Sequence, residues 1–97
     1  VSSSLIRNLL GKGEMLAAAR LLGRPWTVLE NPCSLGGETS FDLSGYTDLK
    51  EGAYQVRIDG ITCRATLAKM EADKQILALP KDIPPISSNK VIVEFVS

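Results

Sequence analysis

Residues 53–68 read Ala53-Tyr54-Gln55-Val56-Arg57-Ile58-Asp59-Gly60-Ile61-Thr62-Cys63-Arg64-Ala65-Thr66-Leu67-Ala68. Before Asp59, polar and apolar residues alternate, which is typical of a strand that buries one face. Asp59-Gly60 is a strong hairpin signal, because both residues tolerate the positive φ angles of a type I′ turn. The stretch therefore predicts a β-hairpin whose inward side chains are Tyr54, Val56, Ile58, Ile61, Cys63, Ala65 and Leu67.

Further short apolar runs lie on both sides of this hairpin. They are separated by connections rich in turn-forming residues: a loop over 33–38 around Gly36-Gly37, a polar segment over 44–52 and a loop stiffened by Pro84-Pro85. With the hairpin, the runs give six expected strands, at 26–29, 39–43, 53–59, 61–68, 75–79 and 91–96. Short strands with frequent turns favour a small antiparallel barrel or sandwich.

Two short helices are expected before the first strand. The serines at 2–4 supply an N-cap, so the first helix begins at Ser3 or Ser4, and its apolar stripe is Leu5, Ile6, Leu9 and Leu10. A second helix covers 14–22, and Gly23 can adopt the left-handed conformation that ends a helix. The predicted fold is mainly β with α: two short N-terminal helices followed by a small six-stranded antiparallel β-barrel.

The composition is that of an ordinary globular domain. Of the 97 residues, 44% are hydrophobic and 23% are charged, so a single modest core is expected. Eleven basic side chains balance eleven acidic ones, which leaves no net field to attract nucleic acid or an anionic membrane. The sequence contains no histidine, which excludes chemistry that depends on that side chain. No apolar run reaches the length of a membrane-spanning helix.

The two cysteines, Cys33 and Cys63, form neither a CxxC pair nor a dense disulfide framework. We expect two reduced, partly buried thiols in a cytoplasmic protein. A disulfide or a metal site is the less favoured alternative, since two thiols without histidine supply half of a structural zinc shell. The first residue is Val1, which suggests a piece of a longer protein.

The N-terminal run resembles a known family. Its motifs, in order, are Ser2-Ser3-Ser4-Leu5-Ile6-Arg7, Gly13-Glu14 and Leu21-Leu22-Gly23-Arg24-Pro25-Trp26. They look like the end of the FMN adenylyltransferase domain of prokaryotic bifunctional FAD synthetases, which reads Ser-Ser-Thr-x-Ile-Arg, Gly-Asp or Gly-Glu, and Leu-Leu-Gly-Arg-Pro-Tyr. The resemblance implies that residues 1–24 are the helical tail of an adenylyltransferase domain. It also implies that residues 25–97 are a shortened riboflavin-kinase-like β-barrel.

The resemblance weakens along the barrel. Residues 52–58 look like the family's Gly-Val-Tyr strand and residues 90–96 like its last barrel strand. The family's Pro-Thr-Ala-Asn segment, whose Thr and Asn hold the metal and the nucleotide phosphates, is replaced by a stretch with Thr39, Ser40 and Asp42. The strand that bears the family's acidic base is replaced by residues 74–79, which contain no carboxylate. The comparison implies a barrel that has lost riboflavin kinase activity, with Thr39, Ser40 and Asp42 as weak candidates for contacts to flavin or Mg-ATP.

The serines at 2–4 and Arg7 have two interpretations. From the residues alone, they form a capped helix start with a solvated arginine. The resemblance implies that Ser2, Ser3, Ser4 and Arg7 contact the nucleotide phosphates in the full-length protein, a role that suits hydroxyl groups and a guanidinium. No catalytic residue and no metal-ligand set is assigned. ATP, Mg and FMN or riboflavin are the implied substrates and cofactors, and the adenylyltransferase domain is the implied partner.

Three functional hypotheses follow. In the first, the chain is the C-terminal part of an FAD synthetase-like protein of flavin biosynthesis, the barrel is an accessory domain, and the chain alone has no turnover. In the second, it is a divergent active riboflavin kinase that holds its metal with Thr39, Ser40 or Asp42. In the third, it is a non-catalytic β-barrel interaction module that binds partner strands at an exposed edge.

Overall fold

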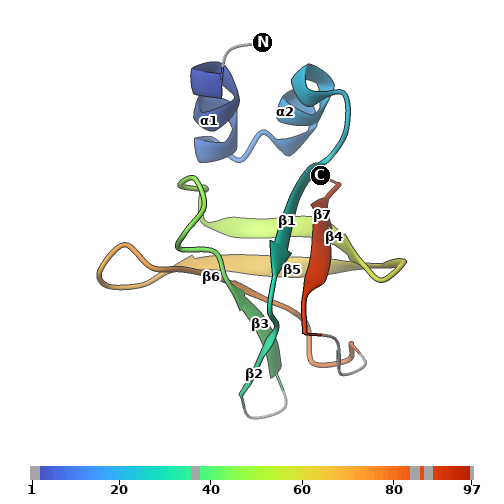
Figure 1. Ribbon diagram of the computed structural model, residues 1–97. Coiled ribbons are helices and arrows are strands. Elements are labelled where there is room, and N and C mark those ends of the chain that lie inside the picture. Colours follow the sequence, from blue (N-terminus) through green and yellow to red (C-terminus); the bar gives the residue numbers. More distant parts are fainter. Residues whose placement is uncertain (1–2, 36–37, 84–85, 87–88, 97) are drawn as a thin grey trace.

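The computed structural model describes residues 3–35, 38–83, 86 and 89–96. Two helices, α1 (Ser3–Gly11) and α2 (Met15–Leu22), lie together at one end of a curled antiparallel sheet (Figure 1). The predicted mainly β fold with two N-terminal helices is therefore confirmed. None of the helices in these ranges is long and apolar enough to cross a membrane.

Over the described residues, the sheet contains seven strands in the order β1-β7-β4-β5-β6-β3-β2, and it curls into a half-barrel. Their bounds are β1 Trp26–Glu30, β2 Cys33–Leu35, β3 Glu38–Asp42, β4 Gly52–Ile58, β5 Ile61–Lys69, β6 Gln75–Ala78 and β7 Val91–Phe95. All six predicted strands are present, and no end is shifted by more than one residue. The chain adds one short strand, β2, at the end of the sheet.

The predicted loop over 33–38 is wrong for Cys33–Leu35. These residues pair with β3, from Cys33 opposite Ser40 to Leu35 opposite Glu38. Three residues are too few for an alternating pattern to be recognised, so the sequence did not indicate this strand. The Gly36-Gly37 pair, where the turn was predicted, lies outside the described residues.

The central hairpin has the predicted register and turn. β4 and β5 pair from Gly52 opposite Leu67 to Ile58 opposite Ile61, and both turn residues have positive φ, 52° at Asp59 and 79° at Gly60. Ile61 lies on the predicted face, opposite the buried Ile58, but it is 43% exposed. The reason is that β6 pairs with β5 only over 66–69 and leaves the start of β5 without a second neighbour.

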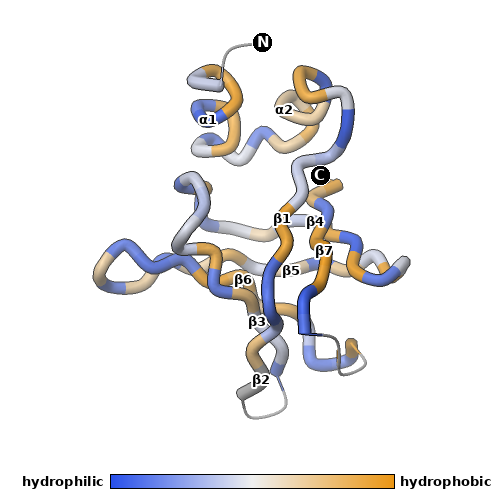
Figure 2. Tube along the Cα trace, viewed as in Figure 1, coloured by the Kyte–Doolittle hydropathy of each residue, from blue (hydrophilic) through white to orange (hydrophobic). Residues whose placement is uncertain are grey.

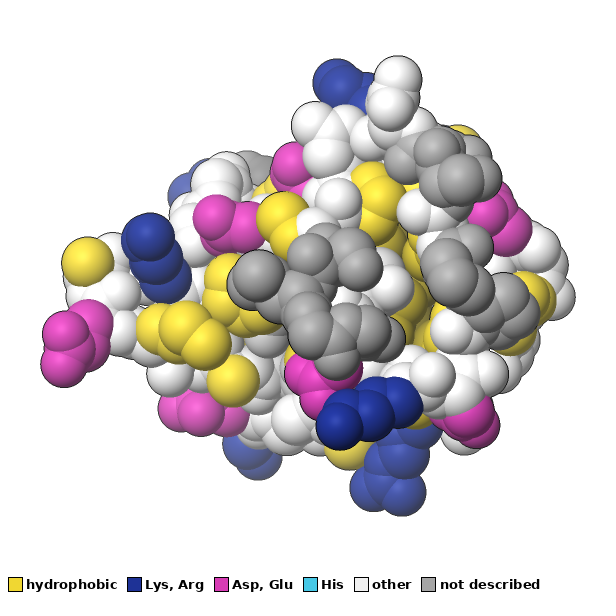
Figure 3. Space-filling model, turned by 90° about the horizontal axis from the view of Figure 1, so that it is seen from below, with side chains coloured by type: hydrophobic (Ala, Val, Ile, Leu, Met, Phe, Trp, Pro, Cys, Tyr) yellow, Lys and Arg dark blue, Asp and Glu magenta, His cyan; other side chains and the backbone are white. Residues whose placement is uncertain are grey.

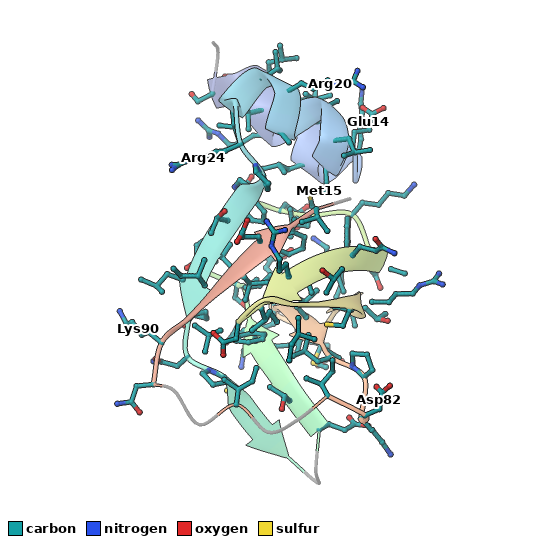
Figure 4. The ribbon with its side chains drawn as sticks, turned by 90° about the vertical axis from the view of Figure 1, so that its right-hand side faces the viewer. Glu14, Met15, Arg20, Arg24, Asp82 and Lys90 are labelled. Atoms are coloured by element: carbon teal, nitrogen blue, oxygen red, sulfur yellow. The ribbon has the colours of Figure 1, made fainter. Side chains whose placement is uncertain are left out.

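One hydrophobic core joins the helices to the sheet. The sheet supplies most of it, including Phe41 and Phe95, which are fully buried, while Trp26 is partly buried against the cluster. Leu10, Met15 and Ala18 of the helices belong to the same cluster, with exposures of 1% or less. Figure 2 shows hydrophobic residues on the helices as well as along the strands, and Figure 4 shows Met15 at the junction between the two layers. The helices therefore pack on the barrel.

Candidate functional site

A cleft of about 330 Å³ lies where the helices meet the sheet. It is formed by α1, the end of α2, the start of β1 and the connection between β3 and β4. Its lining residues are Ser3, Ile6, Arg7, Leu10, Leu22, Trp26, Tyr46 and Thr47. A mainly apolar cleft with a few polar groups is the usual composition of a small-molecule site.

The polar wall of the cleft comes from the first two turns of α1. Ser3 and Arg7 are four residues apart, so they lie one above the other on the same face of the helix, and both line the cleft. Among the residues that line the cleft, Arg7 is the one with a charged side chain. Within the described ranges, Arg7 forms no ion pair. Ser4 is exposed and is not part of the lining, and Ser2 lies outside the described residues. Of the four predicted phosphate-binding residues, the structure therefore places two, Ser3 and Arg7, in the same cleft.

Another part of the lining is aromatic. The ring of Trp26 lies edge-on to that of Tyr46, with centroids 6.2 Å apart and planes at 87°. The ring of Trp26 also packs against that of Phe95, and the centroids of these two rings are 5.2 Å apart. The Tyr46 hydroxyl donates a hydrogen bond of 2.8 Å to the carbonyl oxygen of Leu29 in β1. Burial and the nearby Glu30 carboxylate raise the pKa of Tyr46. These contacts fix both rings beside the cleft.

Gln75 holds the connection that bears Tyr46 and Thr47. Its side chain is 2% exposed, and its amide nitrogen donates hydrogen bonds of 2.8 Å to the carbonyl oxygens of Leu43 and Thr47. Its amide oxygen accepts bonds from the backbone N–H of Leu49 at 3.1 Å and from Lys69 Nζ at 3.3 Å. A glutamine with every side-chain group bonded at this depth acts as a structural clamp.

This role of Gln75 was not predicted from the sequence. The sequence did contain a signal for this role. In a strand, Gln75 lies on the same face as Leu77 and Leu79, which are both buried, so a polar side chain occupies an inward position. A buried polar group at such a position must find partners. The partners could not be deduced, because they lie some thirty positions earlier in the chain, in an irregular connection.

The other predicted candidates lie away from the cleft. Ser40 and Asp42 point to the outer face of β3 and line a second groove of about 390 Å³, whereas Thr39 is not part of its lining. The Asp42 carboxylate accepts hydrogen bonds from the Ser44 hydroxyl and backbone N–H, and these bonds lower the pKa of Asp42. The structure therefore brings together Ser40 and Asp42 but separates Thr39 from them. No group of three or more acidic or cysteine side chains suited to a metal ion occurs among the described residues.

Both cysteines are free in the structure. Cys33 is exposed, and Cys63 is partly buried. Burial, together with the charge of Asp82, raises the pKa of the Cys63 thiol. The prediction of partly buried, unlinked thiols is therefore confirmed for Cys63, whereas it is wrong in burial for Cys33, which is unlinked but exposed.

Comparison with known proteins identifies a fold but no family. No protein-family model matches the sequence, and no curated protein matches it. Among solved structures, the fold is similar to that of the "Macrolide-efflux Protein from Streptococcus pneumoniae", with a TM-score of 0.68 and 19% sequence identity over 98% of this chain. The chain spans about a third of that structure, 35% of its length. At this identity the likeness shows the fold alone.

Proposed function

We propose that this chain is the C-terminal part of an FAD synthetase-like protein, in which a preceding Rossmann-type domain transfers AMP from ATP to FMN. The barrel is then an accessory domain that packs on the transferase domain and has lost riboflavin kinase activity. The protein acts in the cytoplasm. The support is the ordered set of motifs in residues 2–26 and the placement of two of their residues, Ser3 and Arg7, in one cleft.

The chemistry of the cleft agrees with a contact to a phosphorylated flavin or nucleotide. Arg7 presents a guanidinium, which suits bidentate binding of a phosphate, and Ser3 adds a hydroxyl group. Trp26 and Tyr46 form an apolar wall against which a planar ring can pack. In the complete protein, the transferase domain would close the open side of the cleft over the ATP phosphates.

A fluorescence titration of the chain by itself tests the ligand contact. The sequence contains one tryptophan, and Trp26 lines the cleft, so quenching of its emission reports on this site. We expect FMN and FAD to quench it saturably and riboflavin to bind more weakly, because riboflavin lacks the phosphate. Addition of MgATP tests the alternative of a divergent kinase, which would convert riboflavin into FMN and so give turnover in this chain.

A matched pair of variants assigns the phosphate contact. Arg7→Gln should weaken FMN binding about tenfold, the factor that corresponds to about 1.4 kcal/mol, and should leave riboflavin binding unchanged. Arg20→Gln is the control, because Arg20 points away from the sheet on α2 (Figure 4). Equal affinity of the Arg7→Gln variant and the parent chain for FMN would remove Arg7 from the site.

The activity itself is tested on the complete protein. Its upstream region should contain the family's nucleotide-binding His and Gly residues, and the purified protein should form FAD and pyrophosphate from FMN and ATP. An upstream region without those residues, or a protein that forms no FAD, would overturn the proposal.

A further inference from the structure

A polar network around Gln75 connects the surface of the protein with the cleft. Figure 3 shows charged side chains among hydrophobic ones on the face opposite the helices, where they are in contact with solvent. Gln75 is instead 2% exposed, and its amide bonds both to Lys69 of β5 and to Thr47, which lines the cleft. Neither Gln75 nor Lys69 is part of that lining, so any effect of these two residues on a ligand passes through Thr47 and its neighbours.

Different groups of Gln75 hold the two ends of the connection between β3 and β4. At the start of the connection, the carbonyl oxygen of Gln75 accepts the N–H of Leu43 at 2.9 Å, and its N–H donates to the Ser44 hydroxyl at 3.2 Å. Farther along, the side-chain amide bonds to the carbonyl oxygen of Thr47 at 2.8 Å and to the N–H of Leu49 at 3.1 Å. A substitution at position 75 therefore keeps the backbone bonds at the start and changes the bonds to Thr47 and Leu49.

Lys69 sets the orientation of the amide. Its Nζ donates a hydrogen bond to Gln75 Oε1 at 3.3 Å and another to the Asp48 carboxylate. A reversed amide would place its NH₂ group against this cation and its oxygen against the carbonyl oxygens of Leu43 and Thr47, so the observed orientation is the favoured one. The Lys69 side chain is 27% exposed, which places the cation between the solvent and the buried amide.

We propose that Gln75 and Lys69 are positioning residues, which hold Thr47 in place against the ring of a bound flavin. The inference rests on the proposed function, in which that ring packs against the aromatic residues of the cleft. Tyr46 is fixed separately, because its hydroxyl bonds to the carbonyl oxygen of Leu29. Loss of the Gln75 amide therefore displaces Thr47 and leaves Tyr46 in place.

Riboflavin is the probe, because it lacks the phosphate that Arg7 would bind and so reports on the ring contact. In Gln75→Glu at about pH 8, the carboxylate can still accept the bond from Lys69, but it has no hydrogen to donate to the carbonyl oxygen of Thr47. Riboflavin should therefore bind about tenfold more weakly than to the parent chain, as measured by quenching of Trp26.

The pH dependence of this variant separates positioning from a general loss of stability. As the pH falls, the buried carboxyl group takes up a proton, and its O–H can again donate to the carbonyl oxygen of Thr47. The affinity for riboflavin should then rise toward that of the parent chain. The parent chain gives the baseline, because it contains the same titratable groups around residue 75 and the cleft: Arg7, Glu30, Asp42, Tyr46, Asp48, Lys69 and Lys74.

Lys69→Met is the second variant, and it decides the question if Gln75→Glu does not fold. It removes the cation that orients the amide and keeps an apolar side chain of similar length, so riboflavin should bind about threefold more weakly. Lys81→Met is the matched control. Lys81 also pairs with a carboxylate, that of Glu38 at 3.5 Å, but neither residue lines the cleft, so riboflavin binding should be unchanged.

Amide resonances of the chain without ligand distinguish a failure of this inference from a failure of the proposed function. In Gln75→Glu at about pH 8, the resonances of Thr47 and Asp48 should shift, and acidification should return them toward their positions in the parent chain. Unchanged resonances, equal riboflavin affinity of Gln75→Glu and the parent chain, or equal effects of Lys69→Met and Lys81→Met would overturn the positioning role. A parent chain that binds neither riboflavin nor FMN would overturn the proposed function and the ring contact together, while shifted resonances would still establish that Gln75 positions Thr47.

Discussion

At the scale of single residues, Gln75 has more long-range polar contacts than any other side chain in the described ranges. Gln75→Leu would leave the carbonyl of Thr47 and the N–H of Leu49 without the partner that Gln75 supplies, and the carbonyl of Leu43 would keep the N–H of Tyr46 as its donor. We expect a loss of about 3 kcal/mol in the free energy of unfolding, measured by urea denaturation. Gln55→Leu is the control, because Gln55 is exposed on β4 and should change stability by less than about 0.5 kcal/mol. Equal losses in both variants would contradict the clamp role.

The titrating side chains predict a loss of stability in alkali. The pKa of Cys63 is raised from its usual 9.0, first by burial and then by Asp82, and burial raises that of Tyr54 above 10.0. Each group is neutral when protonated, and burial disfavours its charged form, so both pKa values are higher in the folded chain than in the unfolded chain. The unfolded chain therefore releases these protons at lower pH. The free energy of unfolding is therefore unaffected by these groups below pH 9 and falls as the pH rises past 9.0 and then past 10.0. Urea midpoints measured across this pH range test the dependence of stability on pH. Cys63→Ala should remove the decrease that begins near pH 9.0.

At the scale of elements, the end of α2 depends on a glycine. Gly23 has φ 79°, and its N–H bonds to the carbonyl oxygen of Ala19, while no atom lies within 4 Å of the position that a Cβ would take. Gly23→Ala should therefore cost about 1 kcal/mol from backbone strain alone, seen as a lower urea midpoint. Gly45→Ala provides the comparison, because Gly45 has equally open surroundings and no positive φ. A Gly45→Ala variant that loses as much stability would show that strain is not the cause.

At the scale of the whole molecule, the shared core predicts that helices and sheet unfold together. Leu10 of α1 is 1% exposed within the common cluster, so Leu10→Ala should cost about 2–5 kcal/mol. The loss should shift the far-ultraviolet circular dichroism of the helices and the Trp26 fluorescence of the sheet to the same new midpoint. Leu5→Ala, at a position that is 46% exposed, should have a small effect. Two separate midpoints in the Leu10→Ala variant would show that the helices form an independent unit.

The sequence by itself determined the features that depend on neighbouring residues. The alternation in residues 53–58 and the Asp59-Gly60 turn set the hairpin, and Gly23 set the end of α2, because local periodicity and backbone preference act within a few positions. The placement of Leu10 in a core was likewise visible in the apolar stripe of α1. The β2 strand was not visible, since its three residues give no period.

Only the tertiary structure decided which residues share a site. It placed Ser3 and Arg7 in one cleft with Trp26 and Tyr46, separated Thr39 from Ser40 and Asp42, and gave Gln75 its partners. It also showed that the helices pack on the sheet. The residues of the cleft and the partners of Gln75 are about twenty to forty positions apart in the chain, and the sequence pattern indicates which residues are buried but not which neighbour buries them.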